Sequence, residues 1–229
     1  MHTILAIETS SEIASVALLH NESVIAHESA GVQTHSQTVL PMVQALLAQA
    51  GIGLAQCDAL AFGAGPGSFT GVRTACGVMQ GLAFGAGLPV VPVVTLQAVA
   101  QACRELSGAN DVLVVLDARM DEVYWAQYRF ADGWQEVVAP SLSAPSAVLP
   151  AGAVVACGNG LSAYASAFDA APFLAGAYPD LLPNAAQIAR LAQAGFAAGC
   201  AVDARDAQPI YLRNKVALTT AERLAKVAA

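Results

Sequence analysis

The chain has 229 residues and a formal net charge of −7, with 56% hydrophobic and only 12% charged residues. This length suits one bilobal unit or two small domains, and no apolar run reaches the roughly 20 residues of a membrane-spanning helix. Lysine occurs only at Lys215 and Lys226. The composition therefore argues against a protein that grips a nucleic-acid backbone by itself, because that grip needs clustered cations.

Cysteine usage and the N-terminus both favour a cytoplasmic protein. The cysteines are scattered and form no CxxC motif, so neither a disulfide framework nor a zinc site is expected. They suit small core positions in a reducing compartment. The opening MHTILAIETSS lacks the basic region of a signal peptide and meets Glu8 early. We therefore expect a cytoplasmic location and no membrane association.

The first half of the chain predicts the element order βββαβαβα. Three apolar strands form an opening meander, expected at 3–8, 15–19 and 23–29. A capping box at Thr34–Gln37 starts a helix that runs to about residue 50, with apolar residues at helical spacing and Pro41 in its second turn. The remaining expected elements are a strand at 58–64, a helix at 70–84, a strand at 88–94 and a helix at 96–106.

The second half restarts this pattern. Strands are expected at 111–119, 122–130, 134–139 and 153–158, and a helix at 184–199. Asp117 and Asp121 precede a strand of this half at the same spacing as Glu8 and Glu12 precede one in the first half. This internal match predicts a duplicated βββαβα unit.

The predicted fold is therefore α/β, with two RNase-H-like or actin-like subdomains whose mixed sheets are flanked by helices. The division is expected at 1–108 and 109–229. The segment 209–215 is a candidate to dock on the body of the protein, and the last dozen residues are expected to lack order.

The glycine-rich stretch GAGPGS at 63–68 joins an expected strand to an expected helix. Backbone amides at Gly65 and Gly67, with the start of the helix, are suited to binding an anion. The stretch is neither a P-loop nor a dinucleotide fingerprint, and no lysine is near. A tight strand-to-helix turn is the alternative interpretation.

A second group of glycines lies inside the following helix. Gly77, Gly81 and Gly85 are four residues apart and line one face, and each costs roughly 0.5–1 kcal/mol relative to alanine. Close approach of another backbone offsets such a cost. That backbone belongs either to the protein's own sheet or to a helix of another subunit, with the helix at 35–50 alongside.

The residues offer a weak nucleotide site and no catalytic centre. Acidic and hydroxyl residues at the strand ends, with the loop glycines, are the candidates for contact with phosphates: Glu8, Thr9, Ser10, Gly65, Gly67 and Asp117. The four histidines give no pair at helical metal-binding spacing, so no metal site is expected. No serine-nucleophile motif occurs either.

Five stretches carry a resemblance to one family, in order and over nearly the whole chain. They are ILAIETSSEIASVAL, THSQTVLPMV, GAGPGSFTGVRTACGVMQGLA, LDARMDEVYWAQY and PIYLRNKVA. The chain resembles the TsaB (YeaZ-type) family, small actin-like proteins of bacterial tRNA threonylcarbamoyladenosine synthesis. It departs from the family pattern at Asp121, where a glycine is usual.

The resemblance implies a non-catalytic scaffold. Such proteins share their fold with TsaD, which transfers the threonylcarbamoyl group to the adenosine next to the anticodon, but lack its metal-binding histidine pair. The implied partners are a TsaD-like catalytic subunit in a heterodimer, a TsaE-like ATPase in a larger complex, and a second copy when alone; tRNA contact would be indirect. No cofactor is implied beyond weak ATP or ADP binding near the partner interface.

The family's interface helices correspond here to 35–50 and 70–85. The implied interface residues are His35, Gln37, Val39, Leu40, Val43, Leu46, Arg73, Thr74, Gly77, Val78, Gly81 and Leu82. Two other classes remain open at this point. One is an actin-like ATPase or small-molecule kinase that uses the nucleotide candidates. The other is a glycopeptidase-like protease, which the missing metal histidines disfavour.

Overall fold

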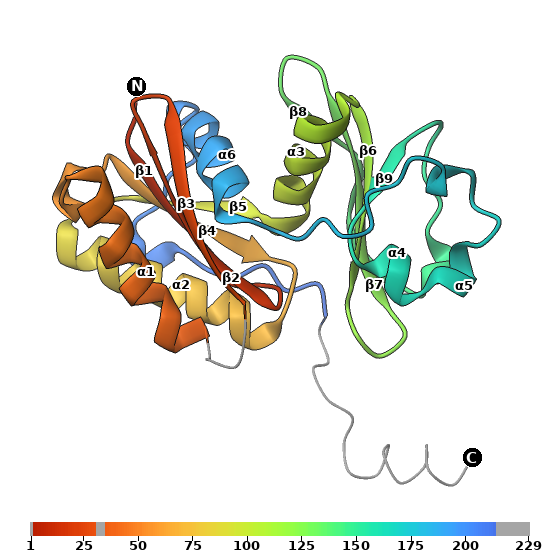
Figure 1. Ribbon diagram of the computed structural model, residues 1–229, viewed down its shortest axis with the longest axis horizontal. Coiled ribbons are helices and arrows are strands. Elements are labelled where there is room, and N and C mark those ends of the chain that lie inside the picture. Colours follow the sequence, from red (N-terminus) through yellow and green to blue (C-terminus); the bar gives the residue numbers. More distant parts are fainter. Residues whose placement is uncertain (1, 31–34, 214–229) are drawn as a thin grey trace, which may run out of the picture.

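Two β-sheets organise residues 2–30 and 35–213, which are the residues that this computed structural model describes (Figure 1). The first sheet has the order β3-β2-β1-β4-β5, with β1, β4 and β5 parallel and the β1-β2-β3 meander antiparallel. Its strands are β1 Ile4–Glu8, β2 Ile13–His20, β3 Ser23–Ala30, β4 Ala59–Gly65 and β5 Val90–Val94.

The second sheet has the order β8-β7-β6-β9, in which only β6 and β9 are parallel. Its strands are β6 Asp111–Asp117, β7 Val123–Phe130, β8 Trp134–Ser143 and β9 Val155–Cys157. The two sheets therefore repeat one arrangement, a three-stranded meander followed by a parallel strand. This confirms the predicted α/β fold with two mixed sheets flanked by helices.

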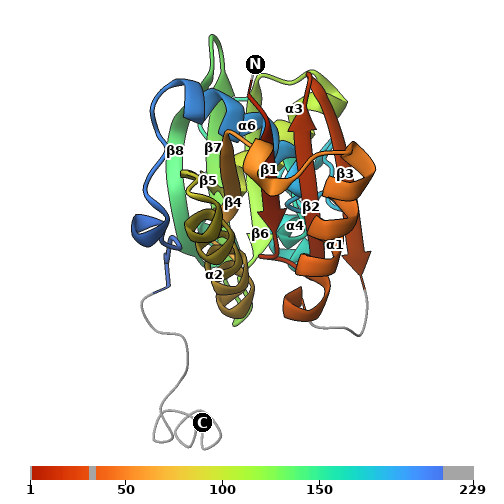
Figure 2. The same ribbon diagram turned by 90° about the vertical axis from the view of Figure 1, so that its left-hand side faces the viewer.

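Helices cover both faces of the first sheet (Figure 2). α1 His35–Ala50 and α2 Phe69–Ala86 lie on one face, and α6 Ala185–Ala197 lies on the other. Because of this double cover, every residue of β1 and β4 is buried, which agrees with their continuous apolar sequences.

The second sheet is covered by α3 Thr95–Ser107 on one face and by the short helices α4 Gly160–Ala163 and α5 Ala165–Phe168 on the other. The short 3-10 turns are η1 Leu54–Gln56, η2 Pro145–Ala147, η3 Pro172–Leu174 and η4 Ala204–Asp206. The helices α4 and α5 were not predicted, because each has only four residues and too short a sequence for helical periodicity to be visible.

Two helices each pack on the sheet of the other predicted subdomain. The chain passes from α3 to β6 near residue 108, where the boundary was expected. Yet α3 packs mainly on the second sheet through residues such as Leu96 and Cys103, whereas α6 returns to the first sheet through residues such as Ile188. The division at residue 108 stays a prediction. Each sheet has a covering helix that comes from the other side of this division.

The remaining differences are small. β2 begins at Ile13 and β8 continues to Ser143, so both strands are longer than expected, and β9 is shorter. Thr34 of the expected capping box and the C-terminal dozen residues lie outside the described residues.

Candidate functional site

Glycines in β4 and in the first turn of α2 make room for the end of β1 and the residue after it. A Cβ atom at Gly63 would stand 1.7 Å from Glu8 Oε2, and one at Gly71 would stand 1.9 Å from the Thr9 carbonyl oxygen. Side chains do not fit at such distances. The hydroxyl of Thr9 donates to the Gly71 carbonyl at 2.7 Å. These two glycines are thus explained by close packing within the chain.

Glu8 is a buried structural acid. Its carboxylate accepts a hydrogen bond from the Ser10 amide and one from the Thr95 hydroxyl at 3.5 Å. The Thr95 hydroxyl also accepts from the Gly65 amide at 3.1 Å, so the carboxylate ties β1 to β4 and to the start of α3. Burial raises the pKa of Glu8, and the hydrogen bonds from Ser10 and Thr95 oppose this rise.

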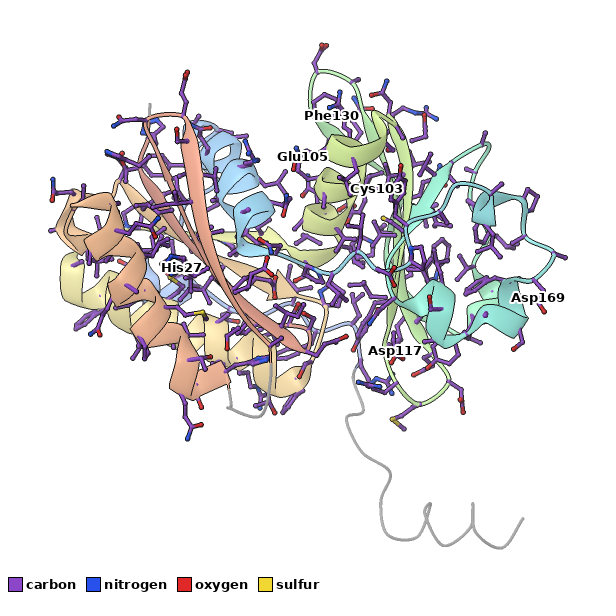
Figure 3. The ribbon with its side chains drawn as sticks, in the orientation of Figure 1. His27, Cys103, Glu105, Asp117, Phe130 and Asp169 are labelled. Carbon is purple, nitrogen blue, oxygen red and sulfur yellow. The ribbon has the colours of Figure 1, made fainter. Side chains whose placement is uncertain are left out.

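A cleft of about 420 Å³ lies between the two lobes. Its walls come from the β1–β2 loop, the β4–α2 loop, the β6–β7 turn and residues 210–213. Of the predicted nucleotide residues, Ser10, Gly67 and Asp117 line the cleft, whereas Glu8, Thr9 and Gly65 do not. Figure 3 shows Asp117 near the lower end of the second sheet.

The cations on the cleft walls are already paired. Arg119 forms an ion pair with Asp117 at 3.1 Å, and Asp117 also accepts from the Tyr164 hydroxyl at 2.9 Å. Arg213 pairs with Glu122 at 2.7 Å. Among the described lining residues, these two arginines are the only Lys or Arg side chains. The cleft therefore presents no uncompensated cation from that set to a phosphate group.

The segment 209–213 docks across the cleft. It is the described part of 209–215, which the sequence offered as a candidate docking segment. The Ile210 amide donates to the Ala64 carbonyl at 2.7 Å, which ties the segment to the end of β4. Arg213 donates to the Ala118 carbonyl at 2.9 Å on the other lobe. Gly65, whose φ is +108°, leaves room for the Ile210 carbonyl, which would stand 2.7 Å from a Cβ atom there.

The second group of glycines has the opposite surroundings. Gly77, Gly81 and Gly85 are exposed, and, apart from the nearby backbone of α2 itself, no atom of the described chain lies within 4 Å of a Cβ atom placed at any of them. Packing on the protein's own sheet, one of the two explanations left open, therefore does not account for them. The same outer face carries Phe84, which is 85% exposed, and Phe69, which is 37% exposed.

The predicted interface residues divide into three groups. Val39, Val43 and Leu46 belong to the core beneath α1, so their assignment to a surface was wrong: the helix needs this stripe to cover the first sheet. Val78 and Leu82 are half-buried against the same core. The remaining residues reach the surface, fully or in part, and are His35, Gln37, Leu40, Arg73, Thr74, Gly77 and Gly81.

Several surface residues of this face are held by polar contacts. Nδ1 of His35 lies 3.2 Å from the Thr9 carbonyl oxygen, and the Thr74 hydroxyl donates to the Thr70 carbonyl at 3.0 Å. The Nε group of Arg73 donates to the Tyr211 hydroxyl at 2.7 Å.

Sequence reasoning missed Phe69, Phe84 and Tyr211 on this face. Phe69 precedes Arg73 by four residues and Gly77 by eight, so helical spacing alone places all three on one face. No sequence pattern indicates that Tyr211 lies beside α2, because that contact depends on the fold.

The described residues hold neither a metal-binding cluster nor a membrane-spanning helix. No cluster of three or more His, Cys, Asp or Glu side chains suited to a metal ion occurs within 2–30 and 35–213. In the same ranges, no helix combines the length and the hydropathy required to cross a membrane.

Comparison with known proteins places the chain in a family. The family described as TsaD, tRNA N6-adenosine threonylcarbamoyltransferase, matches residues 19–221. The tRNA threonylcarbamoyladenosine biosynthesis protein TsaB of Haemophilus influenzae is 41% identical over 93% of this chain and 94% of its own length. The TsaB protein of Escherichia coli is 40% identical over 93% of this chain and 96% of its own length.

A solved structure has the same fold. YeaZ from Pseudomonas aeruginosa is 38% identical and superposes with a TM-score of 0.82, covering 93% of this chain and all of that one. The chain belongs to the TsaB (YeaZ-type) family of tRNA threonylcarbamoyladenosine biosynthesis proteins.

Proposed function

We propose that this chain is a non-catalytic subunit that docks a TsaD-type catalytic subunit through the outer face of α1 and α2. The observation that carries the proposal is the exposed stripe of Gly77, Gly81 and Gly85. Three such glycines cost the helix about 1.5–3 kcal/mol relative to alanine, and the described chain packs nothing against them. A helix from another subunit can approach closely there and bury the neighbouring Phe84.

The non-catalytic role is supported by the state of the candidate reactive groups. The Glu8 carboxylate is buried and hydrogen-bonded within the fold, and the described arginines of the cleft are paired with acids. None of these groups is free to hold or activate a substrate. The relatives are named for tRNA threonylcarbamoyladenosine biosynthesis. In that process, this chain acts as an accessory subunit.

The other partners follow from the same role. A TsaE-like ATPase joins the larger complex, and the free chain pairs with a second copy through the same face. The net charge of −7 leaves tRNA to be held mainly by the catalytic partner. The chain carries no cofactor of its own and works in the cytoplasm.

The test is a reconstitution that contains the TsaD-type and TsaE-type proteins, the threonylcarbamoyl donor system and tRNA. Modified adenosine is measured by mass spectrometry with and without this chain, and complex formation by size-exclusion chromatography. We expect modification to require the chain, and Gly81→Glu to abolish the heterodimer by placing a charge in the stripe. The matched control is Leu106→Glu on α3, where the side chain is 63% exposed. Equal modification without the chain, or an intact Gly81→Glu heterodimer, refutes the proposal.

One observation favours a second candidate, an actin-like ATPase or small-molecule kinase. The cleft lies between the lobes and is lined by Ser10, Gly67 and Asp117, which are nucleotide candidates of the sequence. Isothermal titration with ATP and magnesium separates the two functions. Heat that saturates in the wild-type chain and disappears with Gly67→Glu favours a nucleotide enzyme, whereas no heat favours the scaffold.

A further inference from the structure

Arg73 is fixed in place on the outer face of α2 by two aromatic residues from distant parts of the chain. The centre of its guanidinium group lies 3.6 Å from the centroid of the Phe69 ring and 5.4 Å from that of Tyr211. Its Nε group donates to the Tyr211 hydroxyl at 2.7 Å. An arginine held in this way is oriented before any partner arrives, so little rotamer entropy remains to be lost on binding.

The terminal amino groups of Arg73 have no partner among the residues that the structure describes. Among residues 2–30 and 35–213, no carboxylate pairs with Arg73, and its only hydrogen bond is the one from Nε. The other arginines that lie in helices or at the cleft contact acids or rings inside the fold, as Arg119 and Arg190 do. The two terminal amino groups of Arg73 are thus available to a partner, and the planar guanidinium fits a carboxylate.

Within the two helices of the proposed docking face, Arg73 is the only full charge. Neither α1 nor α2 contains Asp, Glu or Lys, and Arg73 is the only arginine in the two helices. Gly77 lies one helical turn away on the same face. A helix that docks on the glycine stripe therefore removes water from Arg73, and a desolvated guanidinium without an acidic partner is costly.

The absence of carboxylates from α1 and α2 distinguishes the two candidate partners of this face, which are a second copy and a different subunit. A second copy in a two-fold dimer presents the same patch, and its α1 and α2 bring no carboxylate to Arg73. A different subunit is free to bring one. We propose that Arg73 selects a TsaD-type catalytic subunit over a second copy, by pairing with an acidic side chain on the docking helices of that subunit.

The inference rests on the proposed docking function and adds the residue that sets partner choice. Tyr211 acts as a positioning residue, since its hydroxyl accepts the hydrogen bond from Nε of Arg73. The segment 209–213 thereby joins the cleft to the partner surface.

The test measures both equilibria with the full chain. The dissociation constant for the TsaD-type subunit of the same genome is measured by isothermal titration, and that for self-association by sedimentation equilibrium. Arg73→Gln is expected to weaken the heterodimer about 30-fold or more, as removal of one partner from a desolvated charge pair does. Self-association is expected to stay within about threefold or to tighten, because the change removes an unpaired buried charge. Added salt is expected to weaken the wild-type heterodimer more than the Arg73→Gln heterodimer.

The matched control is Arg104→Gln. The Arg104 guanidinium stacks on Phe130 at 3.8 Å, away from α1 and α2, and Figure 3 shows Phe130 at the top of the second lobe. The control should leave both constants unchanged. Tyr211→Phe keeps the ring but removes the acceptor for Nε, and it should weaken only the heterodimer, by less than Arg73→Gln does. Thermal melts of each variant establish that it is folded.

Two results overturn the inference, and they are distinguishable. If the wild-type heterodimer forms but Arg73→Gln binds as tightly, or weakens both equilibria equally, Arg73 does not select the partner while the docking function stands. If the wild-type chain does not bind the TsaD-type subunit at all, the proposed function and this inference fail together.

Discussion

Alanine at Gly71 tests how tightly the start of α2 is packed on the end of β1. A Cβ atom there would stand 1.9 Å from the Thr9 carbonyl oxygen, 2.9 Å from the Thr9 carbonyl carbon and 3.2 Å from Ser10 Cα. All three are backbone atoms, so no side chain can rotate to make space. Ordinary contacts begin near 3.4 Å, so the helix and the loop must separate by about 1.5 Å.

Moving the start of α2 away from the end of β1 lowers the free energy of unfolding. It strains the hydrogen bond from the Thr9 hydroxyl to the Gly71 carbonyl and the one from the Ser68 amide to the Ser10 carbonyl, at 2.7 and 2.8 Å. Each contributes about 1 kcal/mol, and overpacking adds about 1–3 kcal/mol. The better helix propensity of alanine returns about 1 kcal/mol. We expect Gly71→Ala to lower the free energy of unfolding by about 2–4 kcal/mol.

Thermal denaturation followed by circular dichroism measures this loss. For a chain of this size the expected fall in Tm is about 4–16 °C. The matched control is Gly77→Ala in the same helix, where no described atom outside the nearby backbone of α2 lies within 4 Å of the added Cβ. It should raise the free energy of unfolding of the unpartnered chain by about 0.5–1 kcal/mol, when measured over a dilution series that removes self-association. A Gly71→Ala chain as stable as wild type would refute the packing argument.

Three further changes test other parts of the fold. Glu8→Gln should flatten the pH dependence of stability. Because the folded pKa of Glu8 is raised above 4.5, the native state keeps a proton that the unfolded chain has lost. Wild-type stability therefore falls as the pH rises from 4.5 through the folded pKa. Urea titrations at a series of pH values check this, and an unchanged slope would contradict it. Leu46→Ala should cost about 2–5 kcal/mol because the side chain is fully buried, whereas Leu40→Ala should leave chain stability within about 0.5 kcal/mol and weaken only partner binding; equal effects on the urea midpoint would show that this division of α1 is wrong. Arg213→Gln should cost about 1–3 kcal/mol through its lost pairing with Glu122, and a melt that matches wild type would count against the cross-lobe contact.

The sequence predicted most of the elements because their apolar periods are strong. β1 and β4 are continuous apolar runs, and the restart of the pattern after residue 108 revealed the second sheet. The role of Gly63 and Gly71 followed only from the fold, since their neighbours, Glu8 and Thr9, lie at the end of another strand and just after it.

The surface of α2 shows what the spacing of residues cannot predict. The helix is apolar or small on nearly every side, so spacing identified the stripe of Gly77, Gly81 and Gly85 but not which way it faces. The same limit placed Leu46 at a surface, although α1 needs that residue to cover its sheet. Tyr211 meets Arg73 across 138 positions of sequence, a contact that no local pattern encodes.

The exchange of α3 and α6 makes the two lobes depend on each other for folding. A fragment that ends near residue 108 would carry α3 without the second sheet on which it packs, and would leave bare the face of the first sheet that α6 covers. We therefore expect neither half to fold as an autonomous module, although both contain a three-stranded meander followed by a parallel strand. The duplication that the sequence indicates is thus retained in a chain in which each half covers part of the other half's sheet.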